Sequence, residues 1–146
     1  MAESTREILI GKALLTLGTA IYTFVPPVVD ILTPTHIFHL DWVAHARFHT
    51  MWAILSASTM GLIALSMLWL KPAGEPAGVL IAGLISSGVL GSFMIAAIAM
   101  PLYGGALSDP GGVPPLPGGV DLNLVVFAVA LALVLLGWRV ASRAES

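Results

Sequence analysis

All four histidines of the 146-residue chain lie within fourteen consecutive residues, as His36, His39, His45 and His49. Imidazole changes its charge near neutral pH and binds zinc, copper and haem iron, so four imidazoles in one short stretch indicate a ligand or proton site. The chain has no cysteine, which excludes disulfides, iron–sulfur clusters and thiolate ligands. The histidine stretch is therefore the candidate site for chemistry.

His45 and His49 are four residues apart at the start of an apolar segment. On a helix this spacing puts both rings on one face, where two nitrogens can share one divalent metal. We expect the pair to bind a cofactor or to act in catalysis, with a structural hydrogen-bonded pair as the alternative. His36 and His39 would add two nitrogens to a zinc or copper site, or would simply be solvated in their loop.

A haem cannot take both of its axial ligands from His45 and His49, because both rings lie on one side of one helix. One histidine per chain, His45, would leave an open iron face for Lewis-acid or redox chemistry. Met100 is a possible sixth ligand, or else a packing residue. Tyr103 is a candidate proton donor, with anchoring at a membrane interface as the alternative.

The composition indicates how these residues are positioned. The chain is 58% hydrophobic and 10% charged, and its apolar residues form four runs of about the length that spans a bilayer, roughly 20 residues. We predict an all-α integral membrane four-helix bundle in a single transmembrane domain over residues 1–146. A formal net charge of −2 argues against nucleic acid as a partner. The runs are Ile8 to Val29, His45 to Leu70, Pro76 to Met100 and Leu122 to Trp138, with helices expected at about 8–29, 42–70, 76–100 and 121–140.

Local signals suggest where these helices end and which face packs. Pro26 and Pro27 should end the first helix, because proline removes a helical donor and restricts the residue before it. Asp41 and Asp121 should cap the second and fourth helices. The small residues at 83, 87 and 91 should let the third helix approach another helix, within the chain or in a neighbouring copy.

Residues 101–120 contain five prolines and six glycines. Such a segment forms neither helix nor strand, and a long loop in a small protein is often functional. Because it follows the third helix, it should lie on the same side of the membrane as the histidines. We expect either a lid over their site or an ordered plug against the helix ends.

Basic residues are divided unevenly between the two sides of the expected bundle. Because Lys and Arg are enriched in cytoplasmic loops, we expect both termini in the cytoplasm and the chain in the cell inner membrane. The acidic start of the chain differs from a basic leader, so the first run should remain as a span. On the terminal side lie Arg6, Lys12, Lys71, Arg139 and Arg143, with Trp69 and Trp138 as interface markers; the other side has Arg47, with Tyr22, Trp42 and Tyr103.

The motif Asp41-Trp42-Val43-Ala44-His45-Ala46-Arg47-Phe48-His49 resembles that of a family of small, functionally uncharacterised four-span membrane proteins. In architecture the chain is also similar to the styrene oxide isomerases. That resemblance implies a trimeric enzyme in which haem b, held at His45, rearranges an epoxide to an aldehyde. Those isomerases have an asparagine about two turns after the ligand histidine; here His49 or Asn123 would replace it, and Tyr103 could match a tyrosine of that family.

Two functions of different class follow. The first is a homo-oligomeric membrane enzyme that binds haem b or another metal at His45 and converts a small lipophilic substrate entering from the bilayer. The second is a non-catalytic accessory subunit or small-molecule carrier, whose histidines only fasten a loop to the bundle.

Overall fold

The computed structural model describes residues 2–71, 76–109 and 112–144. Within these ranges the fold is all-helical, with α1 at Ala2–Leu32, α2 at Ala44–Leu70, α3 at Pro76–Tyr103 and α4 at Leu122–Ala144. The strand-type pairing among these residues is one isolated bridge, between Leu116 and Val120. All four helices are long and apolar enough to cross a membrane, so the predicted all-α, four-helix fold is confirmed.

The prediction that α1 ends at Pro26 and Pro27 is wrong. Both prolines lie inside α1, which continues to Leu32. Helical hydrogen bonding resumes after them, because the Thr33 N–H donates to the Val29 carbonyl over 3.2 Å. Prolines are tolerated inside membrane-type helices when the rest of the helix satisfies its own backbone groups.

The cap predicted for α2 is also wrong. α2 begins at Ala44, its N-cap residue is Val43, and no side chain caps it. Asp41 therefore lies too far upstream to reach the first turn, and its N–H donates to His39 Nδ1 at 3.1 Å. Arg47 reaches back instead, donating from Nη2 to the His39 carbonyl at 2.8 Å.

The other two helix ends follow known capping patterns. The Asn123 N–H donates to Asp121 Oδ1 at 2.8 Å, which confirms Asp121 as the cap of α4. α3 passes through Pro101 and ends at Tyr103, so the prediction of no helix in 101–120 is wrong for its first three residues. Gly104 adopts a φ of 69°, and the Gly105 N–H donates to the Met100 carbonyl at 3.1 Å, as in a Schellman cap.

The closest helix pair is α1 with α4, and it depends on three glycines. A Cβ at Gly11 would lie 2.5 Å from the Ala141 backbone nitrogen, and one at Gly18 would lie 2.6 Å from the Ala130 carbonyl oxygen. A Cβ at Gly137 of α4 would lie 2.6 Å from the Gly11 carbonyl oxygen. The two backbones therefore touch along this contact.

Between α1 and α3 the core contains a small polar cluster. Ser86 Oγ is hydrogen-bonded to Thr19 Oγ1 at 2.9 Å and to the Tyr22 hydroxyl at 3.2 Å. All three side chains are buried. Tyr22 is therefore a core residue and not the interface marker that its position in the sequence suggested.

The small-residue face predicted on α3 packs only in part. Gly83 is covered by the Trp138 ring of α4, which a Cβ would meet at 2.5 Å, whereas Gly91 has open space beside it.

Lys12 of α1 was expected at the membrane edge, but its side chain is buried. Its Nζ donates to the Leu68 carbonyl at 2.8 Å.

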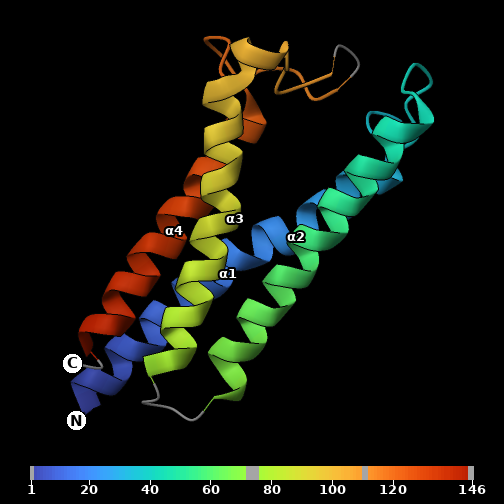
Figure 1. Ribbon diagram of the computed structural model, residues 1–146. Coiled ribbons are helices and arrows are strands. Elements are labelled where there is room, and N and C mark those ends of the chain that lie inside the picture. The colour runs from blue at the N-terminus through green and yellow to red at the C-terminus, as the bar shows by residue number, and fades with distance from the viewer. Residues whose placement is uncertain (1, 72–75, 110–111, 145–146) are drawn as a thin grey trace.

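The helices form a bundle in which α2 and α4 do not contact each other. In Figure 1 the two termini lie together at one end. At the opposite end, the end of α1 and the start of α2 lie apart from the upper ends of α3 and α4. Two connections meet here: the α1–α2 loop (residues 33–43) and the α3–α4 loop, described at residues 104–109 and 112–121.

Candidate functional site

A pocket of about 580 Å³ lies where the two loops meet the ends of α1, α3 and α4. This volume is within the roughly 300–1,000 Å³ typical of sites for small ligands. Its walls are mainly apolar, with Val25 and Val29 from α1, Phe93 from α3, Phe127 from α4 and Val113 from the α3–α4 loop. Phe93 and Phe127 stack with ring centroids 4.1 Å apart. The pocket is therefore suited to the apolar part of a small molecule.

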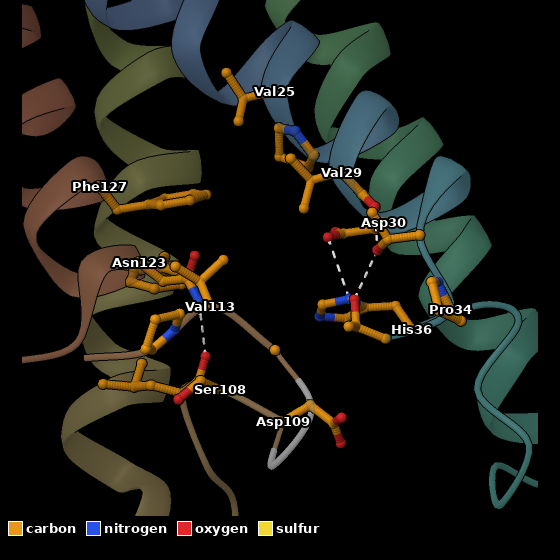
Figure 2. A pocket seen from close by; sticks show the side chains of 17 residues that line it. Val25, Val29, Asp30, Pro34, His36, Ser108, Asp109, Val113, Asn123 and Phe127 are labelled. Atoms are coloured by element: carbon orange, nitrogen blue, oxygen red, sulfur yellow. Dashed lines mark hydrogen bonds and ion pairs between the residues drawn. The ribbon is translucent and has the colours of Figure 1, made fainter.

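One wall of the pocket contains a carboxylate and an imidazole. His36 Nδ1 lies 3.4 Å from Asp30 Oδ1, and the two side chains are 35% and 20% exposed. Figure 2 shows Asp30 and His36 on one wall, with Asn123 and Phe127 on the wall opposite. The polar groups are thus concentrated beside an apolar space, which is the usual design of a ligand site.

The hydrogen bonds around His36 fix which ring nitrogen carries the proton. The Thr33 hydroxyl donates to the Val29 carbonyl, so the Thr35 hydroxyl must donate to Thr33 Oγ1, 2.8 Å away. Thr35 Oγ1 is then an acceptor for His36 Nδ1, at 2.9 Å. The Asp30 carboxylate also requires a proton on Nδ1, because two facing lone pairs would repel.

His36 Nε2 is consequently unprotonated in the neutral ring. Within the described part of the chain it has no hydrogen-bond partner. A carboxylate that accepts from Nδ1–H also holds the ring in this tautomer and orientation. The pocket wall therefore offers one acceptor nitrogen that a bound molecule can use.

The α3–α4 loop is held over the pocket from both sides. Asn123 Nδ2 of α4 donates to the Leu107 carbonyl at 2.9 Å. On the other side, His39 Nε2 lies 3.3 Å from Asp109 Oδ1. Since His39 Nδ1 accepts from the Asp41 N–H, Nε2 carries the proton and donates to Asp109. These bonds fix the loop as part of the pocket wall.

The structure places some of the predicted site residues at the pocket and the others away from it. His36 and Asn123 line the pocket, and His39 contacts its loop. His45 and His49 lie elsewhere, on exposed positions of α2, with their Nε2 atoms 3.1 Å apart. Tyr103 is 61% exposed and donates to the Ala96 carbonyl at 2.9 Å, outside the pocket lining.

The positions of the histidines can be compared with the predicted metal and haem sites. Among the described residues, no three His, Cys, Asp or Glu side chains form a common metal-binding group. The His45 Nε2 that would bind haem iron faces His49, and neither residue lines the pocket. The pocket and His45 thus do not form one haem site, and haem b at His45 stays a prediction.

Two acidic residues of the site were not identified from the sequence. Asp30 was not among the candidate residues, and Asp109 is one residue of the loop rich in proline and glycine. A signal for Asp30 does exist, because no other charged residue lies between Lys12 and the end of α1 at Leu32, and an ionisable group in such an apolar run usually has a functional partner. Asp109 has no comparable signal.

Comparisons with known proteins identify the family of the chain. No curated protein and no solved structure matches it, and the resemblance to styrene oxide isomerases stays a prediction. The model of DUF6640, a family of unknown function, matches residues 15–145. This range includes α2, α3, α4 and more than half of α1. The chain therefore belongs to the DUF6640 family.

Proposed function

We propose that this protein binds a small lipophilic molecule, one that carries a hydrogen-bond donor such as a hydroxyl, in the pocket at the end of α1. The observation that supports this most directly is the free Nε2 of His36 beside an apolar space of about 580 Å³. The apolar walls take the hydrocarbon part of the molecule, and Nε2 accepts the proton of its polar group. A hydrogen bond in such a low-dielectric place gives orientation as well as affinity.

Conversion of the bound molecule is a second candidate function. An imidazole whose Nδ1–H is held by a carboxylate is the arrangement of a general base. Asp30 and His36 have this arrangement. In this role His36 would remove a proton from the bound molecule, Asp30 would stabilise the imidazolium, and Asn123 on the opposite wall would orient the polar group.

We also propose how the chain lies in the membrane. The four helices cross the cell inner membrane, with both termini in the cytoplasm and the pocket near the opposite surface. Supporting this, both termini lie at one end of the bundle (Figure 1), and the basic residues of that end outnumber those at the pocket end. Self-association of the chain is a further proposal, which depends on the resemblance to trimeric isomerases.

The binding proposal is tested by photolabelling the full chain in lipid nanodiscs with a diazirine-bearing fatty alcohol, followed by mass-spectrometric mapping. We expect labels to concentrate on peptides that line the pocket, around residues 25–36 and 112–127. Val25→Trp should reduce this labelling, because Val25 lines the pocket and an indole there takes up its space.

Leu17→Trp is the matched control. Leu17 lies on the same helix and is 58% exposed, but it does not line the pocket. It should leave the labelling pattern unchanged. Labels spread evenly over the exposed apolar faces, or equal loss in the two variants, would show that the alcohol contacts the protein only as lipid does.

A further inference from the structure

The pocket makes no use of His45 and His49, which form a separate site on the first two turns of α2. Their rings meet edge to face, with centroids 4.4 Å apart and an interplanar angle of 86°. The two Nε2 atoms are 3.1 Å apart, and both residues are exposed. The two nitrogens therefore lie side by side on an exposed face of α2.

This distance is the separation that one metal ion imposes on two nitrogen ligands. Zinc–nitrogen bonds are about 2.0–2.1 Å long, so two ligand nitrogens at angles between square and tetrahedral lie about 2.9–3.4 Å apart. A neutral histidine pair at this distance must share a proton between the two nitrogens. A divalent cation would take the place of this proton and accept both nitrogens as ligands.

We propose that His45 and His49 bind one divalent transition-metal ion, Zn²⁺ or Cu²⁺, through their Nε2 atoms. Imidazole nitrogen suits both ions. Two protein ligands leave the other coordination positions to water or to an external ligand. The proposal is independent of the pocket, whose residues contact neither histidine ring in the described structure.

The position on α2 adds a structural consequence. α2 starts without a side-chain cap, so its first N–H groups depend on weaker interactions. A metal ion coordinated by both His45 and His49 cross-links two side chains that are one helical turn apart. Metal binding should therefore slow hydrogen exchange of the amides in this first part of α2.

Copper titration of the untagged full chain in detergent tests the proposal, with electron paramagnetic resonance as the readout. We expect one Cu²⁺ per chain, with a spectrum that shows nitrogen ligands. His45→Gln and His49→Gln should each lose stoichiometric binding. Both residues are exposed, so circular dichroism should show that both variants remain folded.

His39→Gln is the control, because His39 is already engaged by Asp109 and by the Asp41 N–H. It should keep the nitrogen spectrum and the stoichiometry of the unchanged protein. The proposal is overturned if the unchanged chain binds no stoichiometric copper, if either single variant at 45 or 49 retains it, or if His39→Gln loses it equally.

Discussion

Asp30 and His36 share one hydrogen-bond system because the chain turns back directly after α1 ends at Leu32. Thr33 and Thr35 connect the two ends of this turn through their hydroxyl groups. Each hydroxyl donates to the next acceptor, from Thr35 to Thr33 and from Thr33 to the Val29 carbonyl. Because these hydrogen bonds all run in one direction, His36 Nδ1 is a donor and His36 Nε2 is an acceptor.

Asp30→Asn tests this arrangement at the residue scale. An amide carries no charge, so it holds the Nδ1 proton less firmly than the carboxylate does, and Nε2 is then less firmly fixed as an acceptor for the bound hydroxyl. We expect the affinity for 1-decanol, measured by competition with the photoreactive alcohol, to fall about 3- to 10-fold, the value of roughly one net hydrogen bond.

Decane serves as the paired probe, because it has the same chain without the hydroxyl. Its affinity should be the same for the unchanged protein and for Asp30→Asn. An equal loss for decane and 1-decanol would mean that the substitution disturbs the pocket as a whole, and it would contradict a specific role for the imidazole nitrogen.

The sequence predicted the site residues unevenly. The cluster of histidines was informative because imidazole is rare beside apolar segments, and His36 does line the pocket. Asn123 was singled out by resemblance and lies on the opposite wall. Asp30 was missed because its partner depends on the turn after α1, and spacing alone does not determine that turn.

At the scale of the helices, the contact of α1 with α4 is the most extensive in the bundle. It is built on glycines seven residues apart, Gly11 and Gly18, which face Gly137 and Ala130 of α4. Close backbone approach of this kind allows many van der Waals contacts, which are the main source of helix association in a membrane.

Gly18→Ala should destabilise the bundle. Its Cβ would lie 2.6 Å from the Ala130 carbonyl oxygen, so the two helices must separate, at a cost of about 1–3 kcal/mol as for other overpacked sites. Reversible unfolding by a denaturing detergent measures this loss.

Gly88→Ala is the matched control, since Gly88 lies in α3 with no atom within 4 Å of the added Cβ. It should be neutral or stabilise the helix by about 0.5–1 kcal/mol, because alanine is the better helix former. Equal effects of the two substitutions would show that the α1–α4 contact is looser than described.

Composition and run length were enough to predict four helices, because a spanning helix needs a long apolar segment whatever its partners. The helix ends were less predictable. Pro26 and Pro27 did not stop α1, since helical hydrogen bonding resumes beyond them. The glycines of α1 were missed because a seven-residue spacing is a weaker signal than the four-residue spacing on α3. On α3 itself, Gly83 lies in a tight contact and Gly91 does not.

At the scale of the whole molecule, the pocket lies at the end of the bundle where α1 stands apart from α3 and α4, and residues of both loops line it (Figures 1 and 2). Its walls combine residues from 25–36, Phe93 of α3, and residues from 107–109 and 112–127. The bond of His39 to Asp109 joins the two loops. A pocket assembled from such distant segments depends on the tertiary arrangement, so its location could not be predicted from residue spacing alone.

The central claim is that His36 presents an unprotonated Nε2 to a ligand in this pocket. Nitrogen-15 NMR of histidine-labelled full chain, with the four rings assigned by single His→Gln variants, measures this directly. We predict that His36 shows a protonated Nδ1 and an unprotonated Nε2, and that 1-decanol shifts the Nε2 resonance while His49 stays unchanged. A protonated Nε2 in the neutral ring, or a His36 resonance that does not respond to the alcohol, would contradict the account.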